Sequence, residues 1–379
     1  MSAIADTDVL DNVEALEATD SAGMLRDVAT SGAQVRQAVA AAAEAGVGAL
    51  AEAGRPRAVV VTGMGGSGIA GDVLAVVAGL TCSVPITVHR GYGLPGWVGA
   101  ADLVAAVSCS GTTEETLSAA EECVRRGARL VAVGATDSPL HDIATQGRAP
   151  FVPVSVGRQP RAALWSLAVP VIAAAQASGV LDIEAGEFAA AADILDAVSQ
   201  SCRPGSETFV NPAKSLAIEL SESIPVIWGS SSLAGVAAYR FACQLAENAR
   251  YPALSGVLPE AGHNQIVTFD GVLAHGDGDE DLFRDRVDDP ADSRRLRLVM
   301  LRDGEEHPRV RARREAAVEL AQQRGVRVSE ISADAGGPLV RLASLVGPAD
   351  FASVYLALLL GIDPTPVGPI VELKSRIQT

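Results

Sequence analysis

The first 155 residues alternate between two hydrophobic patterns, short β-branched runs and longer segments with apolar residues every three or four positions. The short runs predict strands at residues 58–62, 85–89, 102–108, 129–134 and 151–154. The longer segments predict helices at residues 13–18, 25–43, 69–78 and 113–126. Strands that alternate with helices are typical of a parallel, doubly wound sheet flanked by helices, so we expect an α/β fold.

The second half of the chain repeats this plan after a helical connector. From residue 160 to about 222 the pattern is helical, with breaks at Gly179 and at the CRPG run, 202–205. A strand and a serine-rich turn return at 224–232, and strands are predicted at 296–301 and 326–331. Because 379 residues exceed one typical core, we predict two domains, 1–205 with the connector and 206–379 with a C-terminal helix.

Composition limits the classes of partner. With 30 basic and 46 acidic residues, the formal net charge is −16, which disfavours binding to nucleic acid or anionic membranes. The acidic first 20 residues lack signal-peptide features, and the apolar run at 164–175 is too short to span a bilayer. Five cysteines without a CxxC pair indicate a reducing compartment. We expect a soluble cytoplasmic protein, and we interpret the acidic stretch 276–292 as a solvated loop rather than a metal site.

Two loops that follow predicted strands are candidate phosphate sites. The first, GMGGSG at 63–68, matches the dinucleotide fingerprint, but the expected ribose-binding acid is replaced by Val88, His89 and Arg90. The alternative that the chain is an NADP oxidoreductase therefore depends on the glycine pattern alone. The second loop, SCSGTTEET at 108–116, places many hydroxyls at a helix start, where backbone N–H groups favour an anion. Helix capping by Thr112 or Thr113 is the alternative, although capping explains only one hydroxyl.

Several motifs then occur in a recognisable order: GMGGS (63–67), SCSGTTEET (108–116), PRAA (160–163), ENA (247–249), HN (263–264), SVYLA (353–357), DPTPV (363–367) and LK (373–374). Together they resemble the bifunctional phosphoglucose/phosphomannose isomerases, a branch of the sugar-isomerase (SIS) domain superfamily. The resemblance implies two SIS domains, each with a parallel sheet, and a homodimer with active sites near the subunit interface. It also implies that no metal or redox cofactor is required, and that the sugar phosphate is bound by Gly66, Ser67, Ser108, Ser110 and Thr113, with Arg161 reaching the substrate.

The resemblance assigns catalysis to Glu247, His263 and Lys374. Aldose–ketose isomerisation moves a proton between C1 and C2 through an enediolate, and a carboxylate such as Glu247 suits a base that serves both carbons. Histidine can protonate the ring oxygen near neutral pH, which makes His263 the ring-opening candidate. Lys374 is one of only two lysines, and its ammonium could complete the ring-opening apparatus or stabilise developing oxyanion charge. Without the motifs, the glutamate and the lysine would be ordinary surface residues.

We therefore expect an isomerase that interconverts glucose 6-phosphate and/or mannose 6-phosphate with fructose 6-phosphate. Two departures from the family pattern bear on substrate preference, Thr112 in place of asparagine and Gln265 in place of glutamate after the HN pair. Preference between the C2 epimers would depend on the surroundings of Glu247 and Thr365. A non-catalytic phosphosugar sensor is the main alternative. Glutamine-dependent glucosamine phosphate synthesis is excluded, because its N-terminal catalytic cysteine is missing and the first cysteine is Cys82.

Overall fold

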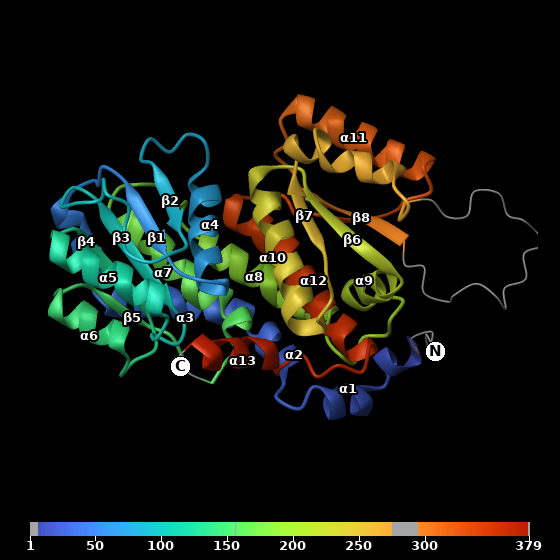
Figure 1. Cartoon of the computed structure of the whole chain (residues 1–379), viewed down its shortest axis with the longest axis horizontal. Coiled ribbons are helices and arrows are strands. Elements are labelled where there is room, and N and C mark those ends of the chain that lie inside the picture. The colour runs from blue at the N-terminus through green and yellow to red at the C-terminus, as the bar shows by residue number, and fades with distance from the viewer. Residues whose placement is uncertain (1–6, 156, 275–294, 378–379) are drawn as a thin grey trace, which may run out of the picture. The chain divides into compact units, whose positions relative to one another are not determined.

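Two parallel sheets organise the chain, as the computed structural model of residues 7–155, 157–274 and 295–377 describes it (Figure 1). The residues fall into two compact units. The first unit comprises Asp27–Ala197 and Ala335–Ala343, and the second comprises Met1–Arg26, Val198–Asp334 and Ser344–Thr379. The acidic stretch 276–292 lies outside the described residues.

The sheet of the first unit has the order β2-β1-β3-β4-β5, and all neighbouring strands are parallel. Its strands are β1 (Val59–Thr62), β2 (Ile86–His89), β3 (Leu103–Ser108), β4 (Arg129–Gly134) and β5 (Phe151–Pro153). Every residue of β1 and β3 is buried, because helices cover both faces of the sheet. The predicted α/β class and all five predicted strands are confirmed, with bounds that differ by at most one residue.

The helices of the first unit form two layers. On one face, α5 (Glu114–Arg126) and α6 (Pro139–Gln146) pack over an apolar cluster that includes Val104, Ala119 and Leu140. On the other face, α4 (Gly66–Ala78) and α7 (Leu164–Ala177) lie against the sheet, and α3 (Ser31–Glu44) packs on α7 (Figure 1). The connector continues from α7 through α8 (Glu187–Ser201), as its helical pattern predicted.

The helix expected at residues 25–43 is wrong in one respect, because two helices occupy that stretch. They are α2 (Met24–Ala29) and α3, and the chain breaks between them at Thr30. Thr30 Oγ1 donates to the carbonyl oxygen of Asp27, and Ser31 Oγ donates to that of Val28, both at 2.7 Å. Hydroxyl side chains that bond to nearby backbone compete with regular helix hydrogen bonding, which accounts for the break.

The sheet of the second unit has the order β7-β6-β8-β9, again with parallel neighbours. Its strands are β6 (Ser223–Gly229), β7 (Leu254–Val257), β8 (Arg295–Arg302) and β9 (Arg327–Ser332), and its main helices are α9 (Pro212–Ser221), α10 (Ser232–Ala249), α11 (Pro308–Gln323), α12 (Pro338–Leu359) and α13 (Gly368–Ile377). The edge strand β7 was not predicted. It is only four residues long, it is incompletely buried and it contains Gly256, so its hydrophobic pattern is weak.

The N-terminal segment joins the second unit, whereas the expected division at residues 205 and 206 groups it with the first sheet. Side-chain contacts give the reason. Asp11, at the end of η1 (Thr7–Asp11), accepts hydrogen bonds from the backbone N–H and hydroxyl of Thr208 at 2.8 Å and from Lys214 Nζ at 3.3 Å. Ser21, just after α1 (Val13–Thr19), donates to the Asp363 carboxylate at 2.8 Å. These partners are far away in sequence, so local pattern could not reveal the grouping.

Helix α12 is the core helix with the most membrane-like composition. Within the described residues it alone is long and apolar enough to cross a bilayer, and 94% of its apolar window is buried inside the protein. Leu345 and Tyr355 are fully buried, and the Tyr355 hydroxyl donates to the carbonyl oxygen of Cys202 at 2.6 Å. Packing within the protein therefore accounts for the apolar sequence of α12.

Candidate active site

The candidate phosphate site lies at the carboxyl ends of β1 and β3 in the first unit. These strands are parallel neighbours, so the loops that lead from β1 to α4 and from β3 to α5 lie at the same edge of the sheet. Ligands of open parallel sheets bind outside this edge, in the crevice between such loops. The fold thus brings together the two loops that the sequence singled out.

Hydrogen bonds link the hydroxyls of these loops. The oxygens of the Ser108 and Thr113 hydroxyls lie 2.9 Å apart, as do those of Ser110 and Thr112. Ser67, at the start of α4, accepts the backbone N–H of Cys109 at 3.3 Å, which connects the two loops. Ser67 and Ser108 are buried, whereas Ser110 is exposed. This hydroxyl cluster presents neutral donors at two helix starts, an arrangement suited to an anion.

Ordinary capping does not explain the Thr113 hydroxyl. Thr113 is the N-cap residue of α5, but its side chain accepts no hydrogen bond from the first turn of that helix. The hydroxyl pairs with Ser108 instead. By contrast, Ser138 caps α6 in the usual way and accepts the N–H of His141 at 3.3 Å. The capping interpretation of Thr113 is therefore wrong.

Gly66 brings a second element to the cluster. A Cβ atom on Gly66 would lie 3.3 Å from the carbonyl oxygen of Pro160 and 3.9 Å from the Cα atom of Arg161. The short helix η3 (Pro160–Ala162) therefore runs against the start of α4. Arg161 is almost fully buried there, and its Nη1 donates to Gln159 Oε1 at 3.4 Å. The structure thus gathers all six predicted phosphate and substrate residues in the first unit.

The glycine fingerprint has a packing explanation that requires no dinucleotide. A Cβ atom on Gly63 would lie 2.9 Å from the carbonyl oxygen of Val107, so glycine is needed for β1 and β3 to continue into their loops. Arg90, the residue that could meet a 2′-phosphate, forms an ion pair with Asp72 of α4. Neither feature favours a nicotinamide cofactor.

The predicted catalytic residues all belong to the second unit. Glu247 lies in the last turns of α10 and is partly buried. His263 follows the short helix η4 (Glu260–Gly262) and is exposed, and Lys374 is exposed on α13. Within the described residues, neither the His263 nor the Lys374 side chain forms a hydrogen bond or ion pair. Glu247 and Lys374 thus lie on helices and His263 lies in a turn, and no hydrogen bond or ion pair in the described part of the chain joins His263 or Lys374 to Glu247.

Helix α10 is held on α12 by buried polar contacts around Glu247. Arg240 forms a two-pronged ion pair with Asp350, with N–O distances of 2.9 and 2.7 Å. Gln244 donates to the same carboxylate at 3.2 Å. Asn248, directly after Glu247, donates to the Ser353 hydroxyl at 2.9 Å and is fully buried. These contacts fix the face of α10 opposite the exposed one, and of this arrangement the sequence alone reveals only the ENA motif at 247–249.

Gln265 replaces the usual glutamate for a local reason. Its Oε1 accepts the indole N–H of Trp228 at 2.7 Å, and its Nε2 donates to the carbonyl oxygen of Ser255 at 3.0 Å. A carboxylate cannot donate the second hydrogen bond. The amide therefore ties β6 and β7 to η5 (Gln265–Asp270), the short helix that follows His263.

Lys214, the other of the two lysines, has a structural role. This side chain is fully buried, and its Nζ donates to the carbonyl oxygens of Pro204 and Ser206 at 2.7 Å and to Asp11 at 3.3 Å. Burial lowers the pKa of Lys214, although its contacts with Asp11 oppose this shift. Because this lysine stabilises the fold, rarity alone does not assign catalysis to Lys374.

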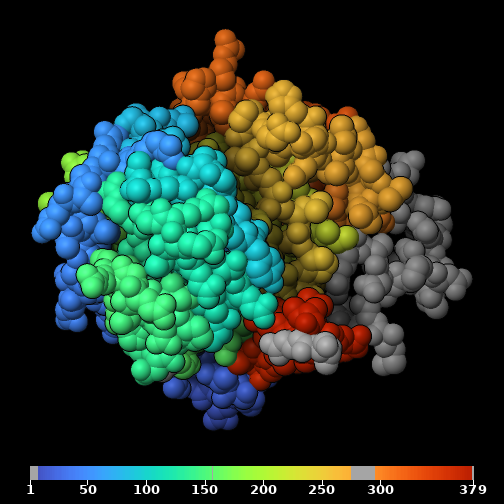
Figure 2. Space-filling model, turned by 60° about the vertical axis from the view of Figure 1, so that its left-hand side comes forward, coloured from blue at the N-terminus to red at the C-terminus, as the bar shows by residue number. Residues whose placement is uncertain are grey.

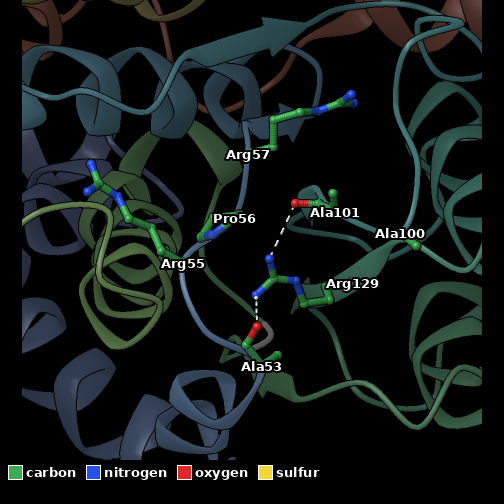
Figure 3. A pocket seen from close by; sticks show the side chains of 7 residues that line it. All are labelled: Ala53, Arg55, Pro56, Arg57, Ala100, Ala101 and Arg129. Atoms are coloured by element: carbon green, nitrogen blue, oxygen red, sulfur yellow. Dashed lines mark hydrogen bonds between the residues drawn. The ribbon is translucent and has the colours of Figure 1, made fainter.

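The first sheet also has a basic hollow, at the end opposite the candidate phosphate site. Its volume is about 640 Å³, and it lies at the amino ends of β1, β3 and β4, lined by Ala53, Arg55, Pro56, Arg57, Ala100, Ala101 and Arg129. Figure 3 shows the Arg129 guanidinium between the carbonyl oxygens of Ala53 and Ala101, at 3.3 Å from each, whereas Arg55 and Arg57 point elsewhere. Arg57 is paired with buried Asp102 at 2.6 Å. Since the three guanidinium groups do not converge, they form no anion cradle.

Comparisons with known proteins agree with the motifs. Residues 209–377 match the family described as bacterial phospho-glucose isomerase C-terminal SIS domain. The chain is 33% identical over 319 residues to the bifunctional phosphoglucose/phosphomannose isomerase of Caldicellulosiruptor bescii, a match that covers 84% of this chain and 89% of the relative. The protein of the same name from Thermoplasma acidophilum is 30% identical, with 84% and 89% covered.

Solved structures share the fold at lower identity. A hypothetical protein of Thermus thermophilus superposes with a TM-score of 0.70 at 16% identity, covering 96% of this chain and 93% of that one. The tagatose-6-phosphate ketose/aldose isomerase of Escherichia coli gives 0.68 at 14% identity, with 89% and 94% covered. The predicted SIS fold is confirmed. By its sequence similarity along most of its length, the chain belongs to the family of bifunctional phosphoglucose/phosphomannose isomerases, which are sugar-phosphate isomerases.

Proposed function

We propose that this enzyme interconverts glucose 6-phosphate and/or mannose 6-phosphate with fructose 6-phosphate. The observation that carries the proposal is the hydroxyl cluster at the carboxyl ends of β1 and β3, where the Thr113 hydroxyl pairs with Ser108 instead of capping α5. A family whose named members isomerise these sugar phosphates supports the choice of substrate.

In this scheme the first unit binds the phosphate. The hydroxyls of Ser67, Ser108, Ser110 and Thr113 would donate to phosphate oxygens, together with backbone N–H groups at the starts of α4 and α5. Neutral donors suit this role in a chain with a net charge of −16, because they bind the dianion without requiring a lysine. Gly66 would admit the phosphate close to the backbone, and Arg161 would contact the substrate.

Residues of the second unit would perform the proton transfers. Glu247 would remove the proton from C2 of the open aldose, leaving an enediolate. The proton on O2 would then move to O1, and Glu247 would return its proton to C1 as the carbonyl forms at C2, so no oxidant or reductant is consumed. His263 would protonate the ring oxygen as the pyranose opens, and Lys374 would stabilise the developing oxyanion.

A cytoplasmic homodimer is part of the proposal. Helix α13 has no buried residue, and Ile370, Leu373 and Ile377 are exposed at spacings of three and four residues. Figure 2 shows the red C-terminal segment at the surface. An exposed apolar stripe of this kind is typical of a helix that packs against another surface, which supports a subunit interface. None of the five cysteines, all of which lie in the described part of the chain, forms a disulfide, which supports a reducing compartment.

A coupled assay with fructose 6-phosphate tests the proposal. Purified enzyme should form glucose 6-phosphate and/or mannose 6-phosphate, each reported by its own coupling reaction, and Glu247→Gln should abolish turnover while its thermal stability is retained. If no product forms and the sugar phosphate still raises the unfolding temperature, the chain would be a phosphosugar-binding protein instead.

A further inference from the structure

Arg250, directly after helix α10, holds a backbone conformation that few non-glycine residues adopt. Its φ and ψ are 53° and 35°, in the left-handed region, and its N–H donates to the carbonyl oxygen of Leu245. Glycine is the usual residue at such a helix end, because a Cβ atom crowds the backbone there. A strained conformation of this kind persists only where the surrounding contacts favour it.

The guanidinium of Arg250 explains why arginine occupies this position. Its Nη1 donates to the carbonyl oxygen of Asp363 at 3.0 Å and to that of Asn248 at 3.4 Å, and its Nη2 donates to that of Pro366 at 2.8 Å. One side chain therefore joins the last turn of α10 to both ends of the segment 363–366. The planar, five-donor guanidinium can reach several carbonyls at once, which an ammonium group does less well.

The segment 363–366 (DPTP) is held in shape by its own contacts. The Asp363 carboxylate accepts the backbone N–H of Thr365 at 2.9 Å and the hydroxyl of Ser21 at 2.8 Å. Two prolines restrict the backbone further. The segment leads directly into α13, which carries Lys374. The Arg250 contacts with Asp363 and Pro366 therefore join this segment directly to the end of α10.

We propose that Arg250 is a positioning residue for the isomerisation. It would fix Thr365 and the start of α13 relative to the helix end that carries Glu247. The expected effect of Arg250 on the reaction rate rests on the proposed function. A displacement of about 1 Å in a reacting or orienting group can lower a rate about 100-fold, so loss of these contacts should slow the reaction.

Arg250→Gly is the decisive variant. Glycine adopts the left-handed conformation without strain, so the end of α10 should keep its fold while the three hydrogen bonds are lost. We expect kcat to fall about 10- to 100-fold, with KM changed less than about twofold because the phosphate-binding groups are intact. The ratio of glucose 6-phosphate to mannose 6-phosphate formed should also shift. Arg148→Gly is the matched control, since Arg148 is exposed and has a φ of 51°, and its kinetics should stay at the wild-type level.

The three hydrogen bonds of the Arg250 guanidinium form a clamp between the end of α10 and the segment 363–366. Amide hydrogen exchange tests this clamp without relying on turnover. Peptides that cover residues 361–368 should exchange faster in Arg250→Gly than in the wild type, and Arg148→Gly should leave them unchanged. Wild-type kinetics in Arg250→Gly would overturn the positioning role, and unchanged exchange would overturn the clamp. If the wild type itself turns over neither sugar phosphate, the proposed function fails and the catalytic role of Arg250 fails with it, whereas the exchange result still decides the clamp.

Discussion

The Thr113 hydroxyl provides a test of the phosphate site, because its structural and functional roles predict different results. Thr113→Val keeps the shape of the side chain and removes the hydroxyl that lies 2.9 Å from Ser108 Oγ. Ser108 retains the Thr113 backbone N–H as a partner at 3.4 Å. Loss of one neutral hydrogen bond should lower the free energy of unfolding by about 1 kcal/mol.

The effect on binding should be larger. A hydrogen bond to a charged group contributes about 1.5–3 kcal/mol, and about 1.4 kcal/mol corresponds to a tenfold change in affinity. We therefore expect KM for the sugar phosphate to rise about 10- to 100-fold. The stabilisation that saturating sugar phosphate gives in a thermal-shift titration should weaken in parallel.

Thr145→Val is the matched control for this experiment. Thr145 is exposed on α6, and its hydroxyl donates to the carbonyl oxygen of His141 at 2.9 Å, away from the cluster. The same substitution there should leave KM at the wild-type value. If Thr113→Val loses stability but keeps the wild-type KM, the hydroxyl serves only the fold and the phosphate assignment is refuted.

Three further predictions test the packing around the two sheets. Burial disfavours ionisation of Asp102, but hydrogen bonds from Arg57 and from backbone N–H groups outweigh this effect and hold the pKa of Asp102 below the ordinary 3.8. The ionised carboxylate should therefore stabilise the fold above that pH, and this stabilisation should be lost as the pH falls below it. Urea unfolding should therefore show Asp102→Asn less stable than the wild type near neutral pH, with the difference closing in acid, and a constant difference would contradict the pKa shift. Gln265→Glu should lower the unfolding free energy by about 1–3 kcal/mol, since a carboxylate cannot donate to the Ser255 carbonyl, and a more stable variant would contradict this. Asn248→Ala, which removes a fully buried side chain, should cost about 1–3 kcal/mol in the same assay, whereas an unchanged midpoint would mean that its bond contributes nothing.

Local pattern predicted the first sheet well because both faces of that sheet are buried. β1 and β3 contain only buried residues, and their continuous apolar runs are distinctive. β7 has the opposite character, since Leu254 at its start is exposed and glycine interrupts it. The break at Thr30 was missed for another reason, because hydroxyl-to-backbone bonds rather than hydrophobic periodicity set the helix ends.

The candidate site was predictable only as far as its motifs reach. The loops of Ser67 and Ser108 are recognisable because strand, loop and helix follow each other directly in the chain. The contacts that support Glu247 are not, since Asp350 and Ser353 lie more than 100 residues away from their partners on α10. Composition also misleads where a residue type has two roles, as buried Lys214 and exposed Lys374 illustrate.

The most direct test of the central claim is isomerisation of fructose 6-phosphate in D₂O, followed by nuclear magnetic resonance for the wild type and Glu247→Gln. A carboxylate base that exchanges its proton with solvent should place deuterium at C2 of the aldose phosphate. We predict deuterated glucose 6-phosphate and/or mannose 6-phosphate from the wild type and no product from Glu247→Gln. Product formed by Glu247→Gln at the wild-type rate would contradict the assignment of Glu247 as the base.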